Sequence, residues 1–121
     1  LQPDMFLLSK VSEEYKVTGV HAFTLDSEDG ITAHCRNFAP LYDIDEEAAT
    51  GTASGALTYY LYLNRAIGTN DSCNLVQGEA MGRPSAILTE IAADSKADGS
   101  VDCNIKVGGK AVVLASGEIM L

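Results

Sequence analysis

The segment that most constrains the fold is residues 48–64, an uncharged stretch that has the pattern of a helix without a polar face. Its main stripe recurs at helical spacing and consists of Ala53, Ala56, Leu57, Tyr60, Leu61 and Asn64. Thr58, Tyr59 and Tyr62 make the other sides partly apolar. Because a helix that is apolar all round has to be enclosed, the rest of the chain must supply a wall around it. Gly68 is a natural stop for this helix.

Most of the remaining chain has the period-two alternation of half-buried strands. The predicted strands are residues 20–25, 31–38, 86–91, 101–107 and 111–115. An Asp-Gly pair closes the first hairpin, whose loop we place at residues 26–30. That loop would pair Leu25 with Ile31 and His21 with Cys35. The predicted loop 39–47 ends in acids, residues 94–99 form a polar turn, and the glycine pair 108–109 turns into the last strand.

A short amphipathic helix over residues 3–15 precedes the strands, with Pro3 and Asp4 suited to its first turn. Together these elements predict an α+β fold: a mostly antiparallel, strongly curved sheet of about six strands, wrapped around one central helix. We expect residues 1–121 to form a single domain.

Composition narrows the function classes. The formal net charge of −9 makes nucleic acid and anionic membranes poor partners. No basic segment is followed by an apolar one, and the three cysteines are widely spaced. Both features favour a cytoplasmic protein with unpaired thiols. The chain begins at Leu1 without an initiator methionine, so residues have been removed or the chain is a piece of something longer.

The start of the apolar helix is the most informative segment for chemistry. Acidic residues, including Glu47, precede a first turn that contains only the small residues Thr50, Gly51, Thr52 and Ala53. The first amides of a helix lack internal acceptors and carry the positive end of its dipole, so a carboxylate or phosphate could bind there. A neighbouring carboxylate could then act as general acid or base. The alternative is that Thr50 is an ordinary N-cap and the glutamates only complement the dipole.

A second informative segment, residues 77–85, places two glycines and a proline around Arg83. It suggests a bent or bulged strand with a cation able to face an anion. The alternative is an edge strand with a solvent-exposed arginine. His21 and His34 suggest a metal site only weakly. In the expected pairing they point to opposite faces, and no third ligand has sensible spacing, so we expect no metal.

Three sequence blocks resemble the phenazine biosynthesis-like, or PhzF-type, family. Residues 36–40 and 46–53 are similar to the family pattern R-x-F-A-P followed by E-D-P-A-T-G-S-A. Residues 77–85 resemble the block Q-G-x-x-M-G-R-P-S, and residues 107–112 resemble V-G-G-x-A-V. The blocks occur in the family's order. The resemblance covers essentially the whole chain but only the second half of a family member.

The resemblance implies one lobe of a diaminopimelate-epimerase-like fold, in which two similar lobes enclose an active site. It implies isomerisation or epimerisation of a small carboxylated metabolite by proton transfer, without cofactor or metal. Glu47 falls on the family's second-lobe aspartate, a candidate proton-transfer group. Thr52 falls on a substrate-binding serine, and Thr50 with Gly51 on the amide-donating turn. Ala53 and Arg83 complete the expected substrate-binding set.

The departures from the family pattern put activity in doubt more than the fold. Glutamate replaces aspartate at Glu47 and alanine replaces proline at Ala48, and catalytic geometry tolerates displaced groups poorly. No residue of this chain matches the family's principal catalytic glutamate, which belongs to the amino-terminal lobe. We therefore expect this chain to be inactive without that lobe. The alternative hypothesis is a non-catalytic, stand-alone lobe that dimerises or binds a small organic acid. A third is a structural or protein-binding domain with no small ligand. The expected partners are therefore a small carboxylate and either the missing lobe or a second copy, in a homodimer.

Overall fold

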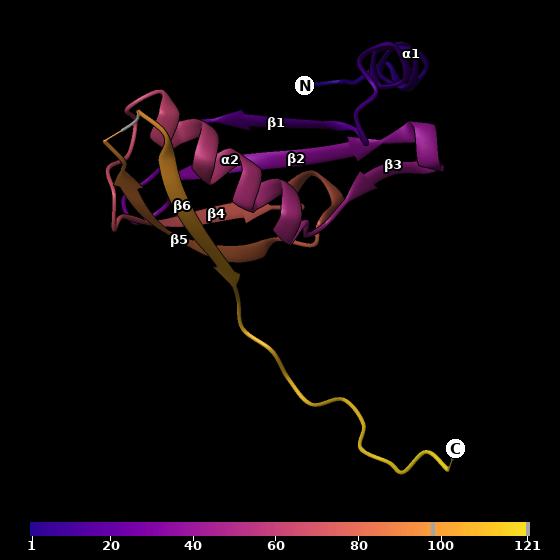
Figure 1. Ribbon diagram of the computed structural model, residues 1–121. Helices are drawn as coiled ribbons and strands as arrows, with labels where there is room; N and C mark the ends of the chain where they lie inside the picture. The colour runs from indigo at the N-terminus through magenta and orange to yellow at the C-terminus, as the bar shows by residue number, and fades with distance from the viewer. Residues whose placement is uncertain (98, 121) are drawn as a thin grey trace.

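The computed structural model describes residues 1–97 and 99–120 and shows a six-stranded sheet that curls around one helix (Figure 1). The helices are α1 (Met5–Tyr15) and α2 (Gly51–Leu63), with short 3₁₀ turns η1 (Pro40–Tyr42) and η2 (Glu79–Met81). The strands are β1 (Val20–Thr24), β2 (Ala33–Ala39), β3 (Ile44–Glu47), β4 (Ser72–Gln77), β5 (Ser85–Ser95) and β6 (Val101–Gly108). The α+β fold with a strongly curved sheet is therefore confirmed.

The strand order is β1-β2-β4-β5-β6, and β3 pairs with β2 outside this path. All neighbours are antiparallel except β2 and β4, which run parallel. The parallel pair follows from the path of the chain. Helix α2 comes between β2 and β4 in the sequence and carries the chain back across the sheet, so that β4 starts from the same end as β2. The sheet is thus mixed, a small correction to the antiparallel sheet expected from the sequence.

The core lies between α2 and the inner face of the sheet. From α2 it takes Leu57 and Leu61, both at most 5% exposed, which pack with Ala33, Cys35, Cys73, Leu75 and Ile87. Ser54 and Thr58 are also fully buried, and the Thr58 hydroxyl meets the Thr89 hydroxyl at 2.6 Å. The opposite side of the helix is open: Tyr60 is 53% exposed and Leu63 is 55% exposed. The expectation of a helix surrounded on most sides is therefore wrong for this chain.

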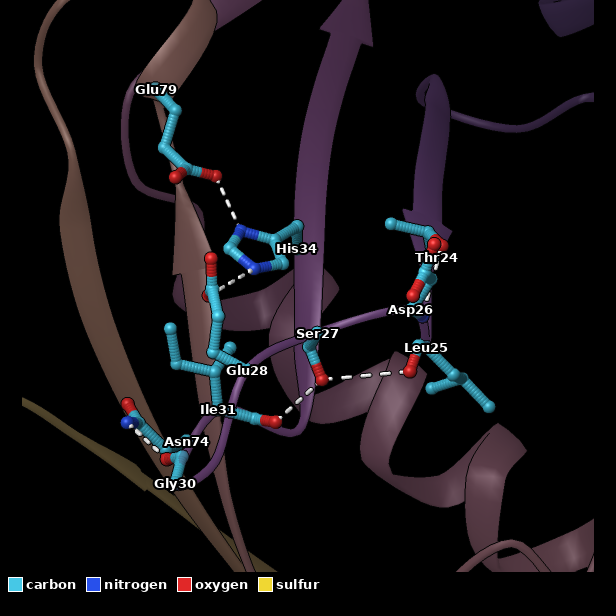
Figure 2. A network of polar contacts seen from close by, with 10 residues as sticks. All are labelled: Thr24, Leu25, Asp26, Ser27, Glu28, Gly30, Ile31, His34, Asn74 and Glu79. Atoms are coloured by element: carbon cyan, nitrogen blue, oxygen red, sulfur yellow. Dashed lines mark hydrogen bonds and ion pairs between the residues drawn. The ribbon is translucent and has the colours of Figure 1, made fainter.

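The first hairpin has a longer loop than the sequence predicted. His21 pairs with Asn37 and Phe23 with Cys35, a shift of two residues from the expected register. Because the shift is even, every side chain keeps its predicted face. The loop is held by the Ser27 hydroxyl, which donates to the carbonyl of Ile31 at 2.7 Å, as Figure 2 shows.

Other boundaries also differ. The predicted loop 39–47 begins with the last residue of β2 and contains η1 and β3, in which Ile44 and Glu47 pair with Ala39 and Asn37 of β2. Helix α2 ends at Leu63, capped by Asn64, well before Gly68. Strand β4 was not predicted as a separate strand. Of the predicted turn 94–99, residues 94 and 95 extend β5, residues 96, 97 and 99 lie between β5 and β6, and residue 98 lies outside the described residues.

The predicted strand 111–115 is wrong. Residues 109–120 run away from the sheet without strand pairing (Figure 1), and Val112, Val113 and Leu114 are 81–91% exposed. A run of apolar residues forms a strand only where the edge of a neighbouring strand can pair with it, and these residues pair with no strand in the described chain.

Helix α1 begins at Met5, two residues later than predicted, and ends at Tyr15 as predicted, so Pro3 and Asp4 precede the helix instead of forming its first turn. The Asp4 carboxylate accepts a hydrogen bond from the Leu7 amide at 3.0 Å, as an N-cap does. Ser12 faces the body of the protein and is fully buried, whereas Tyr15, expected on the same stripe, is 69% exposed. In the described part of the chain, no helix is long and apolar enough to cross a membrane.

Candidate active site at the amino end of helix α2

A cleft of about 1220 Å³ opens beside the amino end of α2. Its walls come from the segment before β1, strands β1 and β2, the segment 42–50 and the first turns of α2. Five of the residues predicted to act in the site line it: Glu47, Thr50, Gly51, Thr52 and Ala53. The structure therefore brings these five together around one cavity. Their roles remain predictions.

The Glu47 carboxylate is held by one of its two oxygens. The Thr50 hydroxyl donates to Oε2 at 2.6 Å, and the Asn37 amide nitrogen donates to the same oxygen at 3.3 Å. Within residues 1–97 and 99–120, Oε1 has no hydrogen-bond partner. A carboxylate held in this way keeps one oxygen available for proton transfer to a bound molecule.

The tip of α2 is not capped by its own N-cap residue. Thr50 has the extended backbone of an N-cap, with φ −134° and ψ 93°, but its side chain makes no capping hydrogen bond. Gly51 and Thr52 are exposed, and the first intrahelical bond is donated by the Ser54 amide to the Thr50 carbonyl at 3.0 Å. The amides of the first turn therefore face the cleft without a side-chain acceptor in the described chain, in an orientation that suits an anion.

Gln77, the last residue of β4, is fully buried and hydrogen-bonds to the segment that leads into this turn. Its Nε2 donates to the Glu47 carbonyl at 2.7 Å and to the Thr50 hydroxyl oxygen at 3.0 Å. Its Oε1 accepts from the Thr50 amide at 3.2 Å. The whole carboxamide is thus used to fix the segment that carries Glu47 into the helix.

Gly78 allows this close approach. Its φ is +86°, and a Cβ added there would lie 2.4 Å from the Arg83 carbonyl oxygen and 2.8 Å from that of Ala48. Only glycine meets both the backbone conformation and the space. The Gln77-Gly78 pair therefore has a structural explanation: it docks the loop after β4 against the segment that enters α2.

His21 contacts the same Asn37 side chain that donates to Glu47. Its Nδ1 is 3.1 Å from the Asn37 Oδ1. Since the Asn37 Nδ2 donates to Glu47, Oδ1 is the acceptor, and the imidazole carries its proton on Nδ1. Nε2 is buried without a partner in the described chain, and burial lowers the pKa of His21, partly opposed by the bond to Asn37. The imidazole is therefore neutral near neutral pH.

The arginine of the first sequence block is structural. Arg36 lies on the outer face of β2 and forms two hydrogen bonds to Glu46, Nε to Oε1 at 2.9 Å and Nη2 to Oε2 at 2.8 Å. Glu46 is next to Glu47 in β3, so their side chains point to opposite faces of the sheet. The pair lowers the pKa of Glu46 and raises that of Arg36.

Arg83 is exposed and is not among the residues that line the cleft, so the structure does not bring it together with the other predicted site residues. Its amide donates to the Gly78 carbonyl at 3.0 Å. His34 lies on the outer face, where its ring meets the Glu79 and Glu28 carboxylates at 2.6 and 3.4 Å (Figure 2). Among the described residues, no group of three or more His, Cys, Asp or Glu side chains is arranged to hold a metal ion.

Asn37, Gln77 and His21 were not recognised as site residues from the sequence. Asn37 and Gln77 both lie within the family blocks, and that position was the available signal. The sequence suggests His21 only as a metal ligand. Its contribution depends on the pairing of β1 with β2, which the sequence placed two residues out of register.

Two solved structures share this fold. A phenazine biosynthesis protein of the PhzF family from Bacillus anthracis superposes with a TM-score of 0.65 at 16% identity, covering 88% of this chain and 40% of the other. A predicted epimerase from Pseudomonas aeruginosa superposes with a TM-score of 0.55 at 23% identity, covering 95% of this chain and 37% of the other. The chain thus has the α+β fold seen in these PhzF-like structures.

The family follows from the sequence: residues 1–117 match the model of the phenazine biosynthesis-like proteins, and the chain belongs to this PhzC-PhzF family. An uncharacterized isomerase of Clostridium acetobutylicum is 36% identical over 100% of this chain and 40% of its own length. The trans-2,3-dihydro-3-hydroxyanthranilate isomerase of Pseudomonas chlororaphis is 33% identical over 71% of this chain and 30% of its own length. This chain thus spans between 30% and 40% of the length of these two relatives.

Proposed function

We propose that this chain is one lobe, the carboxy-terminal one, of a two-lobed isomerase that transfers a proton on a small carboxylated metabolite. In this proposal the substrate carboxylate lies over the amides of Gly51, Thr52 and Ala53, where the helix dipole favours negative charge. The Thr52 hydroxyl adds a hydrogen bond. The free Oε1 of Glu47 exchanges a proton with the substrate.

The observation that carries the proposal is that Glu47 lies beside an uncapped helix amino terminus inside one cleft. General acid–base catalysis needs a proton-transfer group within reach of a fixed substrate, and this arrangement supplies both parts. The named isomerases among the relatives support the same class of reaction. We propose that it needs no cofactor or metal.

A second lobe would complete the cleft. The relatives are much longer than this chain, and the open side of α2 exposes Tyr59, Tyr60 and Leu63 by 36–55%. Such an apolar face is normally covered by protein. We propose that the missing lobe covers it and supplies the second proton-transfer group, so that this chain alone is inactive. Cytoplasmic location is part of the same proposal.

The alternative is a non-catalytic lobe in which a second copy covers this face and a small organic acid occupies the tip. The open side of α2 supports this alternative as well as it supports the two-lobed isomerase. Glu47 and Ala48 favour the alternative further, since both residues depart from the family pattern. A homodimer of this chain in sedimentation, with no larger gene product, would support the alternative.

The experiment uses the complete gene product in deuterium oxide with a panel of small carboxylates. An isomerase that works by proton transfer should exchange one substrate hydrogen for deuterium, which proton NMR detects as signal loss. We expect Glu47→Gln to slow this exchange by about 10²-fold or more. Glu118→Gln, in the exposed segment after β6, is the matched control and should retain exchange. Equal exchange by wild type and Glu47→Gln would refute the assignment of Glu47.

A further inference from the structure

We propose that Gln77 is a positioning residue that sets the direction of the Thr50 hydroxyl and so keeps the first turn of α2 uncapped. The inference rests on the proposed function for its consequence, carboxylate binding, but its structural part stands separately. It explains why a threonine that is correctly placed as an N-cap does not act as one.

The backbone of Thr50 is already in the capping conformation, so only the side-chain direction decides whether it caps. A capping Thr50 would turn its hydroxyl oxygen toward the amides of Thr52 or Ala53. Instead the hydroxyl lies between Gln77 Nε2, which donates to it at 3.0 Å, and Glu47 Oε2, which accepts its proton at 2.6 Å. With these two hydrogen bonds in place, the Thr50 side chain makes no capping bond to the helix.

Gln77 can hold this arrangement because its own position is fixed. It is fully buried, its Nε2 also donates to the Glu47 carbonyl at 2.7 Å, and its Oε1 accepts from the Thr50 amide at 3.2 Å. If the carboxamide were absent, the Thr50 hydroxyl oxygen would lose its buried donor, and the bare amides of the first turn would become the remaining donors for that oxygen. The cap would then compete with any carboxylate for the same amides.

Two consequences follow for the site. The amides of the first turn stay available, and the Thr50 hydroxyl keeps donating its hydrogen bond to Glu47 Oε2, which leaves Oε1 as the oxygen open to the cleft. A single buried glutamine thus links the anion-binding part of the site to the proton-transfer part. This role depends on the contacts of Gln77 and needs no contact between Gln77 and the substrate.

The test compares Gln77→Met, which keeps the length of the side chain, with the double variant Gln77→Met/Thr50→Val, which has no hydroxyl to form a cap. The first readout is the χ1 rotamer of Thr50, measured from three-bond scalar couplings in the wild type and in Gln77→Met. The second is the affinity of sodium benzoate, followed by the amide shifts of Gly51, Thr52 and Ala53. Asn74→Met, on the same strand but bonded to Gly30, is the matched control.

We expect Gln77→Met to change the Thr50 rotamer and to weaken benzoate binding by about fivefold, the usual worth of a cap. The double variant should recover most of the wild-type affinity, which a merely structural loss would not do. An unchanged Thr50 rotamer, or no recovery in the double variant, would overturn the inference. If the wild type itself gives no benzoate shifts at the tip, carboxylate binding fails, while the rotamer result still decides the role of Gln77.

Discussion

Arg36 and Glu46 form a two-point ion pair that ties β3 to β2 one residue before Glu47. Their side chains are 24% and 12% exposed, so the pair is partly shielded from solvent. The catalytic candidate is therefore carried by a short strand whose position depends on a contact on the opposite face of the sheet.

Replacing Arg36 with Met should lower the free energy of unfolding by about 1 kcal/mol, since a well-oriented, partly shielded pair is at the upper end for such contacts. The pKa of Glu46 is lowered by Arg36, so this stability is present above the unfolded pKa of that carboxyl and lost as pH falls through its lower native pKa. Urea unfolding at neutral and at acidic pH measures it. A difference between wild type and Arg36→Met that does not shrink in acid would contradict this role.

Replacing Gly78 with Ala should destabilise the protein by more than about 2 kcal/mol, because positive φ and a backbone clash act together. The added Cβ would lie 2.4 Å from the Arg83 carbonyl oxygen. Gly82→Ala is the matched control: its φ of +66° is also positive, but a Cβ there meets nothing within 4 Å. It should cost only about 1 kcal/mol. Equal losses in thermal unfolding of the two variants would rule out the close packing proposed for Gly78.

Replacing His34 with Gln should remove a pH-dependent part of the stability. The hydrogen bond to Glu79 raises the pKa of His34, and the neighbouring Glu28 adds to the effect. A raised native pKa gives stability that is present below the unfolded value of about 6.5 and is lost as pH rises through the native value. The wild type should therefore lose stability relative to His34→Gln across that window. Denaturant unfolding at a series of pH values measures this, and parallel curves would refute it.

The thiols should differ in reactivity. Burial raises the pKa of Cys35 to about 11, so almost none of it is thiolate at neutral pH, and Cys73 is also buried. Cys103 is only partly buried. A chromogenic disulfide reagent should label Cys103 first in the native protein, and all three after denaturation. Labelling of Cys35 as fast as Cys103 would contradict the packing of β2.

Much of the fold could be predicted because local patterns carried it. The presence of α1, the alternation in β5 and β6 and the apolar residues of α2 each reflect contacts that the sequence specifies directly. The parallel pairing of β2 with β4 could not be read from alternation, because it depends on how α2 returns the chain. The extended segment after β6 shows the reverse error: its apolar residues predicted a strand, but no edge pairs with it.

The candidate site divides in the same way. Glu47 and the small residues of the first helical turn lie next to each other in the sequence, so their meeting was predictable. Gln77 reaches them from β4, 27 residues beyond Thr50, and His21 reaches Asn37 from another strand. Those contacts depend on strand register, which hydrophobic alternation fixes only to within two residues.

The most direct measurement of the central claim is a titration of the isotopically labelled chain with sodium benzoate, followed through its backbone amides. A carboxylate that binds the uncapped tip should shift Gly51, Thr52 and Ala53 together in one saturable curve. The shifts should weaken with added salt, since the attraction is electrostatic. Saturable shifts confined to these residues are the expected result, whereas no shift at the tip, or binding centred on Arg83, would contradict the proposed site.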